Sequence, residues 1–163
     1  MNIAELPYVL LTAGIALLGL YLANLTYDAG IPNYVSRKFA HLGGATAFLV
    51  FPFLFTSFLW PFILTAGFTL LLAYAHFKRP DTFRGTGGSG RPNALAEINF
   101  PATGVILIGV LWGIFNQPWL AIVPLLFMGA GDAVTGLIRS KVYKREIKGN
   151  WGTYGMFLTC LLL

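Results

Sequence analysis

Long apolar runs, separated by short polar segments, make up most of this chain. Five of them extend over about 6–25, 39–56, 58–77, 100–115 and 119–138. A helix needs about 20 predominantly apolar residues to cross the hydrocarbon core of a bilayer. The pattern therefore predicts an all-α chain with five transmembrane helices. Short uncharged turns near Ser57 and Asn116 join the second helix to the third and the fourth to the fifth, as in helical hairpins.

Two polar segments and a short final run complete the pattern. The segment at about 78–99 contains a Gly-rich run, Gly85 to Gly90, and predicts a polar loop. A basic segment at about 139–150 predicts a second loop. The last run, Trp151 to Leu163, is shorter than a span, so we expect the chain to stop inside a sixth helix. Spans and loops together account for nearly the whole chain, which indicates a single membrane domain over residues 1–163.

The composition supports a lipid environment. Of the 163 residues, 56% are hydrophobic and 10% are charged, whereas roughly a quarter of the residues of a typical soluble domain are charged. Cys160 is the one cysteine, so the chain has no disulfide framework. Glu5 stands where a cleaved signal peptide would carry basic residues, and the first apolar run is long enough to span. We therefore expect the first helix to be retained.

The positions of lysine and arginine predict an orientation, because basic loops stay on the cytoplasmic side of a membrane. With the N-terminus outside, all 11 basic residues fall on the cytoplasmic side, and the two loops on the other side have none. They are Arg37, Lys38, Lys78, Arg79, Arg84, Arg91, Arg139, Lys141, Lys144, Arg145 and Lys148. We expect a multi-pass membrane protein whose basic loops and active face are cytoplasmic. Fixing this topology is by itself a sufficient role for these residues.

A carboxylate within an apolar run is the most unusual feature of the sequence. Asp132 follows Gly131 late in the fifth run, and a charged side chain at membrane depth costs on the order of 3 kcal/mol or more. A role as metal ligand or catalytic base would explain it. A carboxylate near the helix end, paired with a nearby lysine, is the alternative. We favour a functional role, because ionisable residues within spans are functional by default.

Near the start of the second helix, a group of side chains is suited to binding an anion. Arg37 and Lys38 precede His41 by four and three residues, so they share a face with it if the helix begins there. Such a face could hold a phosphate. The alternative is a basic anchor at the membrane interface, and for these residues alone it is the simpler interpretation.

The start of the last helix offers a second anion site. Gly152 and Thr153 follow the basic segment that ends at Lys148. Backbone N–H groups at a Gly-rich helix N-terminus, with a lysine beside them, suit a phosphate. The spacing matches neither the P-loop nor the dinucleotide fingerprint, so a flexible linker is an equal alternative.

Glu97 stands just before the fourth helix, and His76 ends the third. Each by itself is typical of a solvated loop or a membrane interface. We interpret His76 as an interfacial residue, whereas Glu97 is predicted on the same side of the membrane as Asp132, the Gly-rich start of the last helix and the basic residues. Mg²⁺ typically takes one or two carboxylates and completes its shell with water and substrate phosphates, and phosphoryl transfer needs mainly positioning and charge neutralisation. Together these residues favour a nucleotide-phosphate site on the cytoplasmic face.

Three blocks of residues resemble the motifs of a family of CTP-dependent lipid kinases. Arg37-Lys38-Phe39-Ala40-His41 resembles R-K-x-x-H at the start of a membrane helix, Glu97 with Pro101 resembles E-L-x-x-G-P, and Gly131-Asp132 resembles G-D. The last motif continues as K-S-x-x-G-S-x-x-M-F, which is similar to Lys148, Gly149, Gly152, Thr153, Met156 and Phe157. The family includes dolichol (polyprenol) kinase, phytol kinase and the fungal-type diacylglycerol kinase, and is distantly similar to phosphatidate cytidylyltransferases.

The resemblance implies an enzyme that transfers the γ-phosphoryl group of CTP to a membrane lipid alcohol, namely a polyprenol, phytol or diacylglycerol, with Mg²⁺ as cofactor. It implies that Asp132 binds the metal or deprotonates the hydroxyl and that Glu97 is a second metal-binding or positioning carboxylate. The nucleotide phosphates and the developing charge would be held by Arg37, Lys38, His41, Gly131, Lys148, Gly152 and Thr153.

Two other functions remain open at this point. Cytidylyl transfer to phosphatidic acid would use the same nucleotide and metal but release pyrophosphate instead of CDP. A transporter or scaffold, in which Asp132 binds a coupling ion, would show no nucleotide dependence. We expect no nucleic-acid partner, and the sequence fixes neither the lipid nor the oligomeric state.

Overall fold

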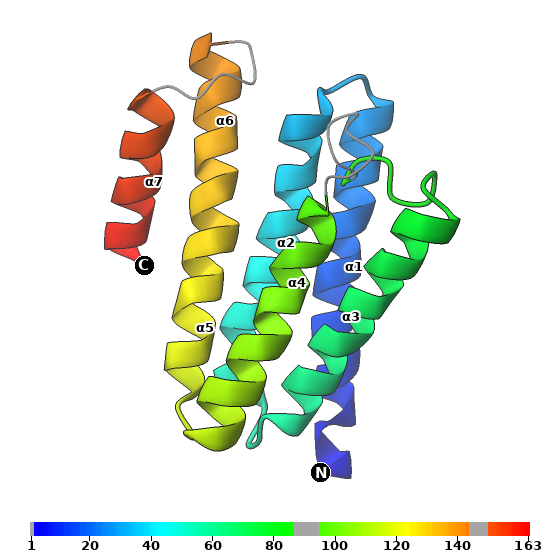
Figure 1. The fold of residues 1–163 in the computed structure, drawn as a ribbon, viewed down its shortest axis with the longest axis vertical. Coiled ribbons are helices and arrows are strands. Elements are labelled where there is room, and N and C mark those ends of the chain that lie inside the picture. The colour runs from blue at the N-terminus through cyan, green and yellow to red at the C-terminus, as the bar shows by residue number, and fades with distance from the viewer. Residues whose placement is uncertain (1, 87–94, 144–149) are drawn as a thin grey trace.

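The computed structural model describes residues 2–86, 95–143 and 150–163 and shows an all-helical bundle (Figure 1). A short 3₁₀ helix, η1 (Ile3–Glu5), leads into α1 (Leu6–Asp28), and α2 (Asn33–Leu54) and α3 (Leu59–Lys78) follow. The helix α4 (Ala96–Leu107) continues without a break into the π-helical segment η2 (Ile108–Ile114). A third rod consists of α5 (Pro118–Leu126), the π-helical segment η3 (Phe127–Gly131) and α6 (Asp132–Tyr143), and α7 (Asn150–Leu162) ends the chain.

The all-helical class predicted from the apolar runs is confirmed, and a helix occupies each of the six predicted places. Four helices in the described residues are long and apolar enough to cross a membrane: Ile3–Asp28, Leu59–Lys78, Glu97–Ile114 and Pro118–Val142. The helix α2 carries several polar side chains in its first turns, and α7 has 13 residues, which is short for a span. Four apolar spans indicate a membrane protein; the count of five to six stays a prediction.

Several helix boundaries differ from the predicted ones. The helix α2 begins at Asn33, directly after Pro32, instead of near Phe39, so the whole basic group of its first turns is helical. The helix α6 extends to Tyr143, so the first part of the predicted basic loop is helical too. The rest of that loop, 144–149, and residues 87–94 of the polar loop lie outside the described residues.

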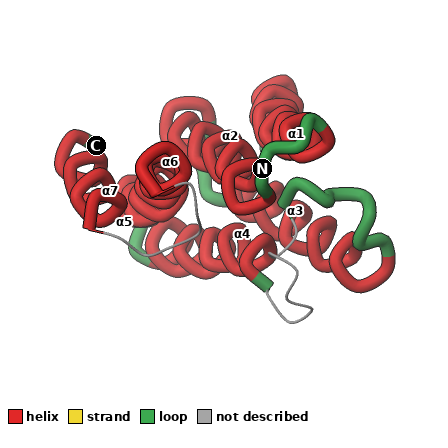
Figure 2. The backbone as a smooth tube through the Cα atoms, turned by 90° about the horizontal axis from the view of Figure 1, so that it is seen from above, coloured by secondary structure: helices red, strands yellow, loops and turns green. Residues whose placement is uncertain are grey.

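Close packing of helices depends on small residues at a few positions. A Cβ atom placed on Gly19 of α1 would lie 2.8 Å from the Cα atom of Gly43 in α2, so the two backbones are in direct contact there. Small residues allow such approach between membrane helices, where dispersion contacts replace the hydrophobic effect. On its other side α2 packs against α5, η3 and α6, which makes it the central helix of the bundle (Figure 2).

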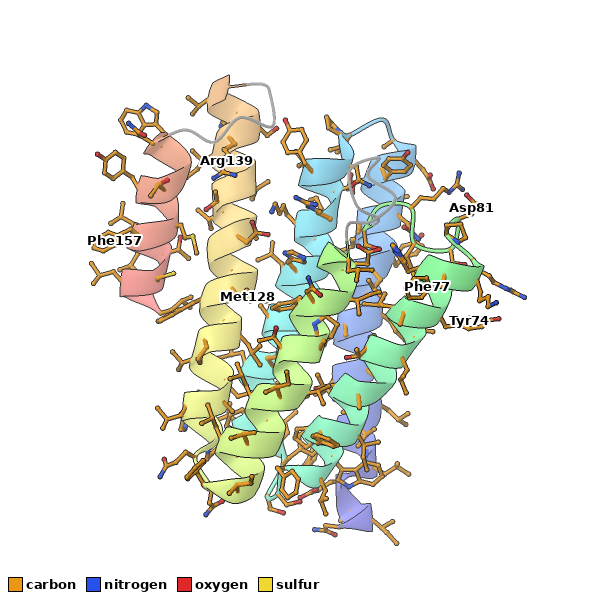
Figure 3. All side chains as sticks on the ribbon, in the orientation of Figure 1. Tyr74, Phe77, Asp81, Met128, Arg139 and Phe157 are labelled. Atoms are coloured by element: carbon orange, nitrogen blue, oxygen red, sulfur yellow. The ribbon has the colours of Figure 1, made fainter. Side chains whose placement is uncertain are left out.

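Aromatic and aliphatic side chains fill the centre and also cover the outside. The buried cluster includes Phe48, Phe100 and Ile122. Large apolar side chains nevertheless point outward, as Figure 3 shows for Phe77 and Phe157, which are 68% and 66% exposed. An apolar surface of this extent is unusual for a protein in water and fits contact with lipid.

The polar ends of the helices gather at one end of the bundle. The α1–α2 turn, the C-terminal ends of α3 and α6 and the N-terminal ends of α4 and α7 all lie at the top of Figure 1. The uncharged α2–α3 and η2–α5 turns lie at the opposite end. Helix connectivity therefore brings the predicted site segments, which are far apart in sequence, to one end of the molecule.

Candidate functional site

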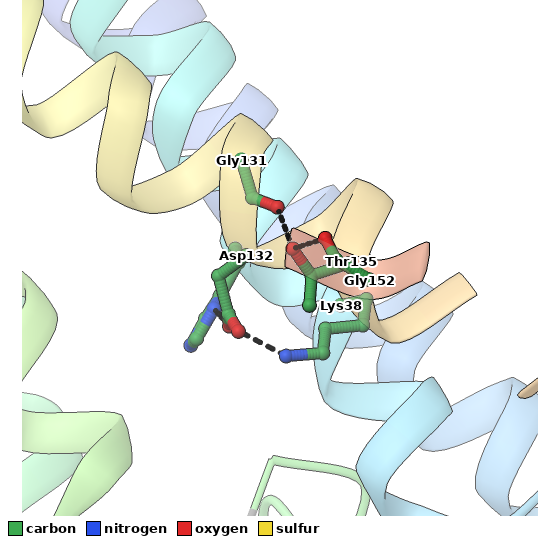
Figure 4. Close-up of polar contacts among 6 residues, drawn as sticks. Lys38, Gly131, Asp132, Thr135 and Gly152 are labelled. Carbon is green, nitrogen blue, oxygen red and sulfur yellow. Dashed lines mark hydrogen bonds and ion pairs between the residues drawn. The ribbon is translucent and has the colours of Figure 1, made fainter. Parts of the chain in front are cut away.

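Asp132 is the first residue of α6 and follows the π-helical segment η3. Lys38 Nζ donates a hydrogen bond to Asp132 Oδ2 at 2.5 Å, and His41 Nδ1 lies 2.8 Å from the same oxygen (Figure 4). Because an ionised carboxylate only accepts hydrogen bonds, Nδ1 is the protonated ring nitrogen of His41. The structure thus joins three of the predicted site residues around one carboxylate oxygen.

The local sequence explains why this cluster forms. Lys38 and His41 are three residues apart on α2, a spacing that puts both side chains on one face of a helix. A Cβ atom on Gly136, one turn after Asp132, would overlap the side chain of Lys38, so the glycine leaves the space through which the lysine reaches the carboxylate. A π-helical turn shifts the register of a helix and is frequent at functional sites; here it directly precedes Asp132.

Burial determines the electrostatics of the cluster. The side chains of Lys38 and His41 are 5% and 18% exposed, whereas that of Asp132 is 37% exposed. A buried ammonium group needs an opposite charge, because desolvation would otherwise be costly. The carboxylate supplies it, and its own accessible side remains open to a ligand. The sequence left open that Asp132 is a structural carboxylate paired with a nearby lysine. This pairing is present, but its lysine, Lys38, is itself a predicted site residue.

Thr135 connects this cluster to the last helix. Its Oγ1 lies 2.8 Å from the carbonyl oxygen of Gly131 in η3 and 3.1 Å from that of Gly152 in α7, so its single hydrogen is shared between these two acceptors (Figure 4). A Cβ atom on Gly152 would lie 2.8 Å from Arg139 Nε, which places the start of α7 against an arginine of α6. The predicted Gly131 and Gly152 blocks are therefore adjacent in the fold.

Two predicted phosphate ligands of the same block have less structural support. Thr153, in the first turn of α7, is exposed. Lys148 lies outside the described residues, as does Gly149. Their roles stay predictions.

Glu97 forms a second polar pair. His76 Nδ1, near the end of α3, lies 2.6 Å from Glu97 Oε1 in the first turn of α4. The two side chains are 17% and 7% exposed, so neither is the solvated or interfacial residue that its sequence context suggested. Only the fold across the polar loop brings them together, and no local sequence signal identifies His76.

One cavity connects the two polar groups. A space of about 80 Å³ lies between α1, α2, α3 and α4, and its lining includes Arg37, His41 and Glu97. His41 also contacts Phe100 of α4, with the ring centroids 5.2 Å apart. His41 therefore faces the cavity and also contacts Asp132.

The carboxylates can be tested for their fit to a metal ion. The described residues contain no group of three or more His, Cys, Asp or Glu side chains that could hold one. Asp132 is accessible enough to serve as the single carboxylate that Mg²⁺ needs when phosphates complete its shell. Glu97 is buried in a separate pair with His76. Within the described residues, Asp132 therefore fits an ion that takes one carboxylate from the protein and completes its shell with other ligands.

Comparison of the chain with protein-family models, with curated proteins and with solved structures finds no match.

Proposed function

We propose that this protein is a CTP-dependent phosphotransferase that acts on a lipid alcohol in the membrane, in the manner of the lipid kinases that its motifs resemble. The contact of Asp132 Oδ2 with both Lys38 and His41 carries this proposal. Lys38 and His41 lie 94 and 91 positions from the aspartate. They belong to one motif block and Asp132 to another, and the resemblance assigned both blocks to one site.

The proposed reaction transfers one phosphoryl group. The hydroxyl oxygen of the lipid bonds to the γ-phosphorus of CTP, the bond between that phosphorus and the oxygen bridging to the β-phosphorus breaks, and CDP leaves. The hydroxyl proton passes to a base, and the product is a lipid monophosphate. Such a reaction requires positioning of the two substrates and neutralisation of the phosphate charge.

The cluster on α2 and α6 can supply this neutralisation. Lys38 and His41 bring cationic or hydrogen-bond-donating groups to a largely water-free environment, in which their interaction with phosphate is strong. Asp132 holds both side chains in position and keeps one accessible side, from which it can bind Mg²⁺ or accept the hydroxyl proton. A bound Mg²⁺ would supply further charge neutralisation on the phosphates.

The start of α7 is the proposed second phosphate contact. Thr135, one turn after Asp132, donates to the carbonyl oxygen of Gly152, so the first turn of α7 is attached to the helix that begins at Asp132. Unpaired N–H groups at a helix N-terminus suit a phosphate. Lys148 and Thr153 would act there, and Arg37 would contact the phosphates from α2.

The proposal includes an orientation. Five or six helices would cross the membrane with the N-terminus outside, and the end of the bundle that carries the basic residues would face the cytoplasm, where CTP is available. The contrast between the basic and uncharged ends supports this orientation.

Product analysis tests the reaction. The purified, reconstituted protein would be incubated with CTP, Mg²⁺ and either lipid alcohols or phosphatidic acid. Release of CDP that depends on an alcohol supports the kinase. Release of pyrophosphate with phosphatidic acid would favour cytidylyl transfer instead, and the absence of both would favour a protein that is not an enzyme.

A further inference from the structure

The cavity between the first four helices has an extended form. It is lined by α1 from Thr12 to Leu20, by α3 from Leu64 to Leu72, and by α2 from Arg37 to Phe51. At 1.5 Å per residue, the α2 lining alone covers about 21 Å of helix length. The lining residues therefore outline a space that is elongated parallel to the helices.

The body of this cavity is apolar. Most of its lining residues are alanine, leucine and phenylalanine. Thr12 and Thr65 do not change its character, because Thr12 Oγ1 donates to the carbonyl oxygen of Tyr8 and Thr65 Oγ1 to that of Pro61 in their own helices. A hydrocarbon chain can fill such a space. Without it, the side chains that line the space lack atoms with which to make dispersion contacts.

One end of the cavity is polar, and it holds an unsatisfied acceptor. The side chain of Glu97 is 7% exposed, and its Oε1 accepts a hydrogen bond from His76. Its other oxygen, Oε2, is buried and has no hydrogen-bond partner among the described residues. A buried acceptor without a donor is costly, and a carboxylate oxygen especially so. Glu97 lines the cavity, so a donor on a bound ligand would satisfy it.

We propose that this cavity binds a single-chain lipid alcohol, with the chain between α1 and α4 and the hydroxyl donating its hydrogen to Glu97 Oε2. His76 acts as a positioning residue, because it holds Oε1 and so fixes the direction of Oε2. The assignment rests on the proposed function for the choice of an alcohol. It places the hydroxyl next to His41, which contacts Asp132 on the phosphate side.

The shape of the cavity also selects among lipid alcohols. A space elongated along the helices matches one extended chain, whereas diacylglycerol has two acyl chains joined near its hydroxyl. We therefore assign the site to an alcohol of the single-chain type, such as a polyprenol or phytol.

Photo-crosslinking without nucleotide tests this site independently of any transfer reaction. The full chain in lipid nanodiscs would be irradiated with a long-chain primary alcohol that carries a diazirine near its far end, and labelled residues would be located by mass spectrometry. The methyl ether of the same alcohol is the matched ligand, because it accepts hydrogen bonds but donates none. Labelling by the alcohol should exceed labelling by the ether about tenfold, because only the alcohol donates a hydrogen bond to Glu97 Oε2. Labels should fall on the part of the lining that is far from Glu97, at Thr12, Phe51 or Leu64.

Two pairs of variants test the residues. Glu97→Gln keeps an oxygen for His76 but replaces Oε2 with an amide N–H₂ donor, which serves an alcohol and an ether alike; the alcohol-to-ether ratio should fall to about one. Ala16→Leu should fill the cavity and reduce labelling by about tenfold. The control Gly14→Leu lies on the same helix, where an added Cβ meets nothing within 4 Å, and should leave labelling unchanged.

Three results would overturn the proposal: labelling outside the cavity, equal labelling of the wild-type protein by alcohol and ether, or equal labelling by a diazirine-bearing diacylglycerol. The wild-type comparison of alcohol and ether needs no variant, so it stands even if Glu97→Gln fails to fold. Cavity labelling that favours the alcohol, in a protein that transfers no phosphate from CTP, would support the binding site and reject the proposed reaction.

Discussion

Lys38 Nζ and Asp132 Oδ2 lie 2.5 Å apart, although the two residues are separated by 94 positions in the chain. One comes from the second turn of α2 and the other from the first residue of α6. This contact fixes the relative position of the two helices at the polar end of the bundle. It also puts a buried ammonium group beside a partly exposed carboxylate, which is the arrangement on which the proposed phosphate chemistry depends.

We expect Asp132→Asn to abolish phosphoryl transfer while membrane insertion stays intact. Asparagine has nearly the same shape, but it removes the negative charge that holds Lys38 and His41 and that could bind Mg²⁺ or take a proton. Transfer assays on protein extracted from the membrane fraction provide the measurement. Full activity of a correctly inserted variant would remove Asp132 from the mechanism.

A double-mutant cycle should reveal the coupling between Lys38 and Asp132. Lys38→Met alone and Asp132→Asn alone each leave one partner of the pair unmatched, whereas the double variant removes both. We expect a coupling free energy of about 1–3 kcal/mol, below the value for a fully buried pair because Asp132 is 37% exposed. SDS-induced unfolding in mixed micelles measures it. Additive effects of the two substitutions would show that the contact contributes nothing to stability.

Gly136→Val should disturb the same contact indirectly. Its side chain would occupy the space of Lys38, which is long and flexible and can move away from the carboxylate. We expect transfer activity to fall by about tenfold, together with a loss of stability of about 1–3 kcal/mol because the contact of Lys38 with Asp132 is broken. The control is Gly67→Val on α3, where an added Cβ meets nothing within 4 Å. Equal activity of the two variants would contradict the role of Gly136.

Much of the fold could be predicted from the sequence, because apolar runs determine where membrane helices form. The boundaries of α1 and α3 were predicted to within a few residues on this basis. The start of α2 was predicted too late, since its polar side chains ended the apolar run although Pro32 marks the true start of the helix. The number of spans stays a prediction for the same reason: polar residues at a helix end reduce hydropathy without ending the helix.

The site was predictable only in part. Asp132 was identified because a charged side chain within an apolar run has a high free-energy cost. The spacing of Lys38 and His41 indicated that they share one face of a helix. That these three residues meet was not contained in any local pattern, because it depends on how α2 packs against α6. The pair of His76 and Glu97 escaped detection for the same reason: each residue is ordinary in its own segment, and burial becomes visible only when α3 and α4 are packed together.

Packing of α1 against α2 gives a prediction outside the site. Gly19→Leu should separate the helices, because the added side chain meets backbone atoms of Gly43. Backbone atoms, unlike a flexible side chain, cannot move aside by a change of rotamer. We expect a loss of about 1–3 kcal/mol in the free energy of unfolding. Gly14→Leu, on the same helix and facing open space, should be neutral or slightly stabilising, since leucine is a better helix former than glycine. The same unfolding assay compares the two, and equal effects would contradict the close contact.

Thr135→Val should weaken the attachment of α7. Valine keeps the shape of the side chain but cannot donate to Gly152, so the carbonyl loses a hydrogen bond worth about 1 kcal/mol. Hydrogen–deuterium exchange should become faster in residues 150–157 and stay unchanged in α1. Unchanged exchange in α7 would show that other contacts hold this helix.

The most direct test of the proposed phosphotransferase reaction is transfer of label from γ-labelled CTP to a lipid. Wild-type protein reconstituted in bilayers would be incubated with Mg²⁺ and, separately, with a polyprenol, phytol or diacylglycerol, and the extracted lipids would be analysed for label, with Asp132→Asn as the inactive control. We predict labelled polyprenol or phytol with the wild-type protein and no labelled lipid with the variant. Absence of labelled lipid with every alcohol, from protein whose helices are folded and inserted, would contradict the proposed reaction.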